Sequence, residues 1–375
     1  MVHVALMGRS IRPRPAGVGR YAANLVDYLC RELPARSLTV FLTRDAPPHS
    51  WPGVVEVRAS IPTPNEYARA LWEQTIVPAR VAALGIDVYH SPNYILPTAL
   101  TCPSVVTIHD VAYLQPRLHR AKSHLYLTVL TALALRRATI VVAVSEHTRR
   151  AVERHYPRVR GRIEVIAEGV DPALQPPIAA RLRAFRQRLG LTEPYILFVG
   201  TLEPRKNLAR LVTAFERAVR ASDLPHHLVL AGNRGWKNEA LDQAIDASPC
   251  RERIHRVGYV SDADLPCWYA GAALVAYPSL EEGFGLPPLE AMACGAPVVT
   301  SNCSAIPEVV GEAALTVDPL DVEALASAMG RVLTEPALAE ALRALGRIRA
   351  KQFSWEEVAR RYRTVYERAA SGESQ

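Results

Sequence analysis

Two glutamates, Glu282 and Glu290, flank a Gly-Phe-Gly turn and a pair of prolines in the segment YPSLEEGFGLPPLEAMACGAPVVT. A carboxylate accepts charge-assisted hydrogen bonds from hydroxyl groups, each worth about 1.5–3 kcal/mol. The backbone N–H groups of Gly283, Phe284 and Gly285 can bind an anion or sugar hydroxyls, together with the start of a following helix. The alternative interpretation is a capped helix with ordinary acidic residues in its first turn, but that explains neither the glycines nor Glu282.

Apolar runs on both sides of this segment predict buried strands at residues 273–277 and 297–300. The paired prolines suit the first turn of a helix between them, because a missing N–H costs nothing there. Gly295 suits the position just after that helix. We therefore expect Glu282 in the loop leaving a strand and Glu290 in the first helical turn. In open α/β sheets, ligands bind at this edge, at the carboxyl ends of the strands.

A pair of cations, Arg205 and Lys206 in TLEPRKNL, follows the strand predicted at residues 195–199 and precedes a helix. A helix N-terminus disfavours each cation by about 0.3–1 kcal/mol. A bound diphosphate would reverse that preference, since arginine offers a fork of donors and lysine a point charge. The alternative is a pair of solvated surface cations.

Two further groups follow predicted strands in the first half of the chain. AGVGRY, with Gly17 and Gly19, comes after the first apolar run and opens a helix. Such a turn lets a backbone approach a phosphate, although the G-x-G-x-x-G form is absent. SVVTIHD places His109 and Asp110 at another strand end. A lone histidine beside an aspartate is more often structural, so the residues by themselves leave both interpretations open.

Taken together, these segments resemble the retaining, two-domain enzymes of glycosyltransferase family 4, which have a glutamate-x7-glutamate signature. The match runs on through LEAMACGAPVVTS and includes GTLEPRKNL. The resemblance implies that Glu290 holds the ribose of a nucleotide and that Glu282 holds hydroxyls of the donor sugar, beside the glycine-bracketed loop. It implies that Arg205 and Lys206 clamp the pyrophosphate and stabilise the departing nucleotide. We also place the nucleobase near the backbone of Val260.

The resemblance extends to the first half. AGVGRY resembles the family's GGVGRY loop, with Ala16 in place of the first glycine, and implies phosphate contact through Gly17. TIHD resembles the family's strand-end His-Asp, which implies that His109 contacts the donor and helps to align the acceptor. We assign Asp110 and Ser145, the latter in VSEHTRR, to the acceptor side. A helix N-cap explains Ser145 equally well.

Composition sets outer limits on these interpretations. A chain of 375 residues is too long for one typical core, so two domains are expected. The six cysteines are scattered without a CxxC pair, which favours reduced thiols in a cytoplasm and argues against structural zinc. Residues 1–170 carry a net charge of +9 and the remainder −2. A basic first half indicates an anionic partner surface, and no helix-turn-helix, finger or RNP-type motif supports nucleic acid.

Short apolar runs alternate with helical patterns throughout, which predicts an α/β fold with mostly parallel sheets. We expect two doubly wound, Rossmann-like domains facing each other across a cleft, an arrangement that the family resemblance names GT-B. The acceptor-binding domain would span residues 1–170, a proline-rich linker 171–190, and the nucleotide-sugar-binding domain 191–353. By the same resemblance, the terminal helix at 354–370 would pack back on the first domain; Ser354 is its N-cap by residue type.

Two segments invite misinterpretation. The pair Asp262 and Asp264 looks like a DxD metal motif, but both lie where acidic residues cap a helix start. We expect no metal and no other cofactor, because Arg205 and Lys206 would neutralise the phosphates. The apolar run at 125–135 is too short to span a bilayer and predicts a buried helix. Basic residues flank it, so a shallow membrane contact stays open; they are Arg117, Arg120, Lys122, Arg136 and Arg137.

The sequence therefore predicts a retaining, metal-independent hexosyltransferase that moves a sugar from a nucleotide diphosphate sugar to an acceptor hydroxyl. The resemblance favours bacterial mannosyl- and rhamnosyltransferases, hence GDP-mannose as donor and a growing polyprenyl-linked glycan as acceptor. We expect a cytoplasmic protein, peripheral on the inner face of the membrane. The competing hypotheses are a glycan phosphorylase, a nucleotide-sugar epimerase and a non-catalytic sugar-nucleotide or glycan-binding protein.

Overall fold

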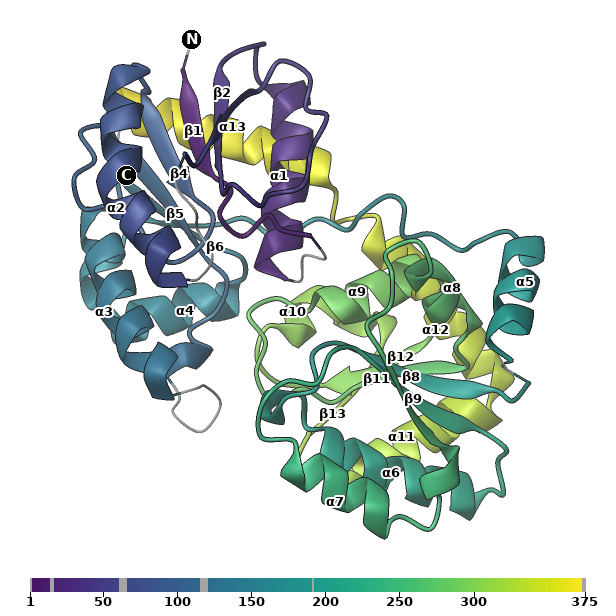
Figure 1. Cartoon of the computed structure of the whole chain (residues 1–375). Coiled ribbons are helices and arrows are strands. Elements are labelled where there is room, and N and C mark those ends of the chain that lie inside the picture. Colours follow the sequence, from purple (N-terminus) through teal and green to yellow (C-terminus); the bar gives the residue numbers. More distant parts are fainter. Residues whose placement is uncertain (1, 14–16, 61–65, 115–120, 191, 373–375) are drawn as a thin grey trace. The chain divides into compact units, whose positions relative to one another are not determined.

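The computed structural model describes residues 2–13, 17–60, 66–114, 121–190 and 192–372 of the chain. Ala16, which replaces the first glycine of the family's loop, lies outside these residues, as do Arg117 and Arg120. The chain divides into two compact units, each with its own sheet (Figure 1). The first unit comprises Met1–Gly169 and Ser354–Gln375, and the second comprises Val170–Phe353.

The first unit is built on a sheet in which seven strands are described, all parallel, in the order β3-β2-β1-β4-β5-β6-β7. Most of these strands are buried along their whole length, as expected where helices cover both faces. The strands are β1 (Val4–Met7), β2 (Leu38–Leu42), β3 (Val55–Arg58), β4 (Val88–Ser91), β5 (Ser104–Ile108), β6 (Ile140–Ala143) and β7 (Ile163–Val165).

Helices cover both faces of this sheet. Because side chains alternate along a strand, Val4 and Leu6 join one core while Ala5 and Met7 join the other. The first core is closed by α1 (Val18–Glu32) and α13 (Trp355–Ser371), and the second by α2 (Glu66–Ala83), α3 (Ala121–Arg137) and α4 (Glu146–His155). Two short 3-10 turns, η1 (Ala112–Leu114) and η2 (Pro157–Val159), complete the described elements of this unit.

The C-terminal helix α13, yellow in Figure 1, lies against α1 in the first unit. Ser354 caps it, accepting a hydrogen bond from the N–H of Glu357 at 3.2 Å, as its residue type predicts. Trp355, Tyr362 and Tyr366 are buried in the first core. The last helix of the sequence therefore supplies part of the core that the first strands begin.

The second unit has the same design. Its described strands form a six-stranded parallel sheet in the order β10-β9-β8-β11-β12-β13. The strand order reverses between β8 and β11, so the loops after these two strands leave in diverging directions. Such a reversal opens a ligand site at the carboxyl edge of the sheet. The strands are β8 (Tyr195–Val199), β9 (His227–Ala231), β10 (Ile254–Gly258), β11 (Leu274–Tyr277), β12 (Val298–Ser301) and β13 (Leu315–Val317).

Helices again lie on both faces of this sheet (Figure 1). One face carries α6 (Leu208–Ala221), α7 (Glu239–Ala247) and α11 (Val322–Thr334). The other carries α8 (Leu265–Gly271), α9 (Leu286–Ala293), α10 (Ile306–Val310) and α12 (Pro336–Ala350). The remaining described elements are α5 (Ala179–Leu189), η3 (Pro204–Lys206), η4 (Arg251–Arg253) and η5 (Gly311–Ala313).

The segment expected to be a linker, residues 171–190, differs from the expectation in its second half. There α5 forms, ending at Gly190 in the left-handed conformation, and Phe185 packs on Trp268 of α8 at 5.1 Å between ring centroids. Alanine, leucine and arginine favour a helix as soon as the prolines end at Pro177. The part without regular structure is therefore confined to residues 171–178.

The apolar run at 125–135 lies in α3. Within it, Thr131, Ala134 and Leu135 are buried, while Val129 and Leu133 are exposed. Of the helices that the structure describes, none combines the length and the hydropathy required to cross a bilayer.

Candidate active site

The cations and the carboxylate predicted to work together follow β8 and β11, the two strands at the reversal point of the second sheet. Arg205 and Lys206 lie in η3, and Glu282 lies in the loop before α9. The turn between η3 and α6 is fixed by Asn207, whose φ of 61° is left-handed. Its Nδ2 donates to the carbonyl of Pro319 at 2.6 Å. A side-chain amide that tolerates this conformation thus separates the cations from the helix that follows.

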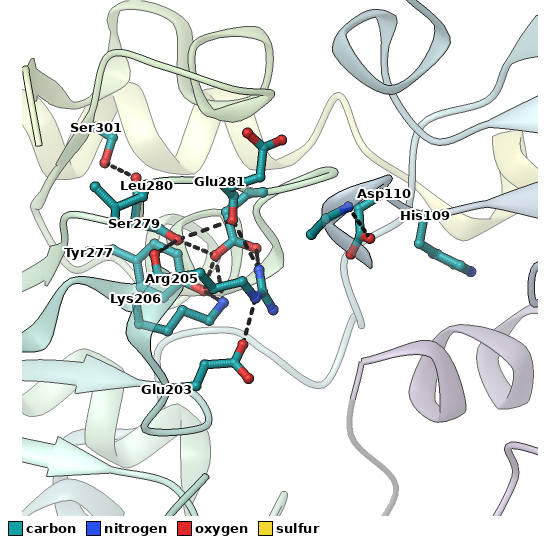
Figure 2. A network of polar contacts seen from close by, with 12 residues as sticks. His109, Asp110, Glu203, Arg205, Lys206, Tyr277, Ser279, Leu280, Glu281 and Ser301 are labelled. Atoms are coloured by element: carbon teal, nitrogen blue, oxygen red, sulfur yellow. Dashed lines mark hydrogen bonds and ion pairs between the residues drawn. The ribbon is translucent and has the colours of Figure 1, made fainter. Parts of the chain in front are cut away.

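Four donors converge on the Glu282 carboxylate, which is only 7% exposed. The residues that supply them, Arg205, Lys206, Tyr277 and Ser279, lie together in Figure 2. Lys206 Nζ and the hydroxyls of Tyr277 and Ser279 donate to Oε1 at 2.5, 2.9 and 2.6 Å. Arg205 Nη1 donates to Oε2 at 2.7 Å. Three of these hydrogen bonds fall on Oε1 and one on Oε2, so the protein engages both oxygens of Glu282.

Arg205 is likewise held from several sides. Its Nε donates to Glu203 at 2.5 Å, and its Nη1 also donates to the carbonyl of Glu281 at 3.0 Å. Glu203 and Glu282 balance the charge of Arg205 and Lys206, because a buried ammonium such as Lys206, 5% exposed, needs a partner.

The electrostatics of the cluster follow from this pairing. Burial alone would raise the pKa of Glu282, but the charges of Arg205 and Lys206 and their hydrogen bonds outweigh it and hold its pKa at about 2. Burial lowers the pKa of Lys206, as does the charge of Arg205, and Glu282 offsets only part of this effect. Glu282 is thus an anion at any physiological pH.

Tyr277 and Ser279 are parts of the cluster that motif reasoning missed. Tyr277 is fully buried, and its hydroxyl accepts from Lys206 Nζ at 2.5 Å while donating to Glu282. Its ring stacks on Phe198 of β8 at 5.4 Å between centroids. A signal was available, because Tyr277 is the last residue of a predicted strand whose carboxyl end faces the site.

Glu290 lies apart from this cluster, in α9. It is 4% exposed and accepts a hydrogen bond from the Tyr269 hydroxyl at 2.9 Å. The expectation of a first-turn position was wrong: α9 begins at Leu286, so Glu290 is its fifth residue. The paired prolines occupy the first turn, which displaces the glutamate into the second.

The Gly283–Gly285 loop connects the two glutamates. Gly285 is the N-cap of α9 with φ 117°, a backbone conformation that favours glycine. The ring of Phe284 is 5% exposed and packs edge-on against Phe353 at 5.8 Å between centroids. The side chain of Phe284 thus anchors the loop, and the backbone is the part of the loop that can contact a ligand. Val260 is half-buried in the loop after β10.

In the first unit, His109 and Asp110 follow β5 but point to different partners. His109 is 7% exposed; its Nδ1 lies 2.9 Å from Oε1 of Glu168 and its Nε2 lies 3.0 Å from the carbonyl of Pro92. Asp110 Oδ1 accepts from the N–H of Ala112 at 3.0 Å and so caps η1. Glu168 is a third residue that sequence reasoning missed; it lies in the loop after β7, within AEGVD.

The remaining residues assigned to the first unit lie at helix starts. Ser145 is the N-cap of α4 and accepts from the N–H of Thr148 at 3.0 Å, which bears out the N-cap alternative. Gly17 is the N-cap of α1 with φ 47°, and Gly19 is buried in the first turn of that helix. Both glycines follow β1, at the reversal point of the first sheet.

The DxD-like pair behaves as a helix start. Asp264 precedes α8, and its N–H donates to Oγ of Ser261 at 3.2 Å. Its carboxylate pairs with Arg188 at 2.6 Å on an exposed surface. Throughout the described ranges, no group of three or more histidine, cysteine, aspartate or glutamate side chains could hold a metal ion.

Comparisons with known proteins identify the family of the chain. A family described as Glycosyltransferase Family 4 matches residues 16–174, and one described as Glycosyl transferases group 1 matches residues 193–335. O-antigen chain mannosyltransferase B of Escherichia coli is 36% identical over 271 residues, 72% of this chain and 71% of that protein. MMP alpha-(1->4)-mannosyltransferase of Mycolicibacterium hassiacum is 35% identical over 198 residues, 52% of this chain and 47% of that protein.

Solved structures share the fold at lower identity. Sucrose-phosphate synthase from Thermosynechococcus elongatus superposes with a TM-score of 0.81 and 23% identity over the full length of both chains. WaaG, a glycosyltransferase involved in lipopolysaccharide biosynthesis, superposes with a TM-score of 0.76 and 17% identity over 97% of this chain and 99% of its own. The two parallel sheets make this a GT-B fold. With the sequence matches over both units, the chain belongs to glycosyltransferase family 4.

Proposed function

We propose that this glycosyltransferase moves mannose from GDP-mannose to a hydroxyl of a glycan or lipid-linked acceptor, with retention at the anomeric carbon. The family assignment supports the glycosyl transfer itself. Relatives named as mannosyltransferases, among them a protein of O-antigen chain synthesis, support mannose as the transferred sugar. On this basis the product belongs to a surface polysaccharide of the O-antigen type.

The observation that carries the proposal is the cluster at the reversal point of the second sheet, with Arg205 and Lys206 held around Glu282. When a nucleoside diphosphate leaves a sugar, negative charge develops on its terminal phosphate. Preorganised cations at that position stabilise the transition state without a metal ion. In our proposal the diphosphate takes over contacts that Glu282 now makes with both cations, which frees its carboxylate to accept a sugar hydroxyl.

Other residues complete the donor site in this proposal. Glu290 binds the ribose, the backbone at Gly283–Gly285 contacts the sugar, and the backbone near Val260 contacts the base. The first unit contributes Gly17 beside the phosphates and His109 beside the reacting sugar, with Asp110 and Ser145 on the acceptor side. Retention follows from same-face attack with charge stabilisation and alignment, since transfer passes through an oxocarbenium-like state.

The basic first half favours an anionic partner surface, which suits a lipid-linked acceptor at the inner face of a membrane. We therefore propose a cytoplasmic protein that contacts that membrane peripherally.

A donor screen tests the proposed function. Full-length protein is incubated with GDP-mannose, other GDP-sugars, UDP-glucose and dTDP-rhamnose, in EDTA, and both thermal stabilisation and slow release of the nucleotide are measured. We expect GDP-mannose to give the largest effect, and Glu290→Gln to abolish it without loss of the folded state. If no donor in the panel releases its nucleotide, the proposal is contradicted. Conversion of a donor to its epimer would instead show that the protein is a nucleotide-sugar epimerase.

A further inference from the structure

Two buried histidines on neighbouring strands of the first unit differ in the chemistry of their partners. His90, in β4, has Nδ1 2.7 Å from the Tyr366 hydroxyl and Nε2 2.8 Å from the Thr107 hydroxyl. A hydroxyl can either donate or accept, so a neutral imidazole satisfies both bonds. Burial accordingly lowers the pKa of His90 to about 3, with a further contribution from His109.

His109 has partners of the opposite kind. Its Nε2 faces the carbonyl oxygen of Pro92, which can only accept, and its Nδ1 faces the carboxylate of Glu168. If Glu168 is ionised, both ring nitrogens must carry hydrogen. If instead Glu168 carries the proton, it donates to Nδ1, while Nε2–H still donates to Pro92. Either way, the pair holds one proton more than a neutral imidazole beside an ionised carboxylate.

The surroundings make this proton difficult to remove. His109 and Glu168 are 7% and 4% exposed, so a charge on either one alone would be costly. Burial lowers the pKa of His109, but the hydrogen bond and charge of Glu168 outweigh it, and the resulting pKa is raised. Five other titratable groups face the pair: Tyr21 of α1, His90 of β4, Tyr94 in the loop after β4, Asp110 in the loop after β5 and Tyr362 of α13.

We propose that Glu168 is a positioning residue that keeps His109 protonated, so that His109 serves glycosyl transfer as a fixed cation and not as a base. The inference depends on the proposed function, which places His109 beside the reacting sugar. A general base must offer a lone pair to the acceptor hydroxyl, and neither ring nitrogen offers one in this arrangement. The acceptor proton must therefore leave to another group, such as the departing phosphate.

The protonation state is measured first, without any substrate. Full-length protein is labelled with ¹⁵N-histidine, and the ring nitrogens of His109, assigned with His109→Gln, are followed from pH 5 to 10. We expect both nitrogens to be protonated at pH 7. In Glu168→Gln the pKa of His109 should fall by about one unit or more, since a nearby carboxylate shifts a pKa by roughly 1–3 units. Glu164→Gln, which removes a β7 carboxylate paired with Arg368, is the matched control and should leave His109 unchanged.

The second readout is the pH dependence of transfer. In Glu168→Gln the alkaline decline in kcat should begin at lower pH, with an activity loss of about tenfold per unit of pKa at high pH. KM for the donor should stay within about twofold. Glu168→Asp keeps the carboxylate and should restore most of the wild-type profile, which separates this role from a merely structural one.

Three results would overturn the inference: a bare ring nitrogen on His109 in the wild-type protein at pH 7, an unchanged His109 pKa in Glu168→Gln, or an unchanged pH profile in that variant. Failure of the proposed function looks different. In that case no donor is turned over by the wild-type protein. The NMR titration still reports whether Glu168 keeps the proton on His109.

Discussion

The two sheets share a strand order, yet their carboxyl edges hold charge in different ways. In the second unit, Arg205 and Lys206 pair with Glu282, whose pKa of about 2 keeps the cluster ionised. In the first unit, His109 is charged only when it is protonated, and Glu168 helps it to retain that proton. Glu282 thus stays ionised throughout the physiological range, whereas the pair of His109 and Glu168 can titrate. The same fold therefore supports one site built around a carboxylate that stays ionised and another site whose charge depends on a bound proton.

The difference begins with residue type. Arginine keeps its charge when buried, and the sequence places Lys206 next to Arg205 on one loop, where Glu282 offsets part of the effect of burial on the lysine. Histidine is neutral near pH 7 unless a partner raises its pKa. His90 and His109 illustrate this within one unit, because hydroxyl partners leave the first neutral whereas a carboxylate favours the protonated form of the second.

The largest effect is expected from removing a permanent charge of the second unit. Lys206→Met keeps the aliphatic stem but leaves Glu282 with one cation fewer. We expect kcat for transfer to fall by about 10²–10³, the usual loss when one preorganised stabilising group is removed. Lys237→Met, at an exposed position beside Trp236, is the control and should keep wild-type rates. If kcat falls equally in both variants, Lys206 has no special role in transfer.

Acid unfolding tests whether the carboxylate of that cluster is tied to its cations. The folded-state pKa of Glu282 is depressed, so its stabilising contribution is present above about pH 4.5 and is lost as pH falls towards 2. Because folding is linked to the ionisation of Glu282, this carboxylate contributes about 3 kcal/mol in total to the free energy of unfolding. About 2 kcal/mol of that contribution is lost between pH 5 and pH 3. Urea unfolding at these two pH values should therefore show a smaller drop for Glu282→Gln than for the wild-type protein. The exposed control Glu323→Gln should retain the wild-type drop.

A smaller effect is expected from Tyr277→Phe, which keeps the ring on Phe198 but removes the hydroxyl between Lys206 and Glu282. Losing one hydrogen bond to a charged group costs about 1.5 kcal/mol, so kcat should fall by about tenfold. Tyr366→Phe is the control, because the hydroxyl that it removes forms a hydrogen bond with His90 in the first unit. Its kcat should stay within about twofold of the wild-type value. A Tyr277→Phe enzyme with wild-type kcat would show that the hydroxyl does not position the cluster.

The smallest effect is expected at the DxD-like pair. Asp264→Ala removes an exposed ion pair with Arg188, which contributes less than about 1 kcal/mol. Transfer rates should remain unchanged in this variant and also in the wild-type protein with EDTA. A loss of activity that added Mn²⁺ or Mg²⁺ restores would mean that a metal, and not the cation pair alone, neutralises the donor.

Much of the second-unit site could be predicted from sequence because its residues lie in contiguous motifs. TLEPRKNL and EEGFGLPPLE each follow an apolar run, and parallel strands bring their ends to one edge. The partners of Arg205 could not be predicted, since Glu203 and Glu282 reach it only after the loops have folded. Likewise, two consecutive prolines shifted Glu290 from the first helical turn to the second.

The first unit was harder to predict because its contacts are distant in sequence. Glu168 lies 59 residues from His109, and neither its residue type nor its spacing marked it as the partner of that histidine. Tyr362 donates to or accepts from Tyr21 across 341 residues, a contact that depends on α13 returning to the first core. The sequence indicated the helix, with Ser354 as its N-cap, but only the folded chain shows which hydroxyls it brings to His90.

The most direct test of the central claim, that the Arg205–Lys206 cluster binds the donor diphosphate without a metal, is calorimetric titration of GDP in EDTA. We predict that the wild-type protein binds GDP and that Lys206→Met weakens the affinity by at least about tenfold, as expected for the loss of one charge-assisted hydrogen bond. Equal affinities for the two proteins, or binding by the wild-type protein only when a divalent cation is added, would contradict the claim.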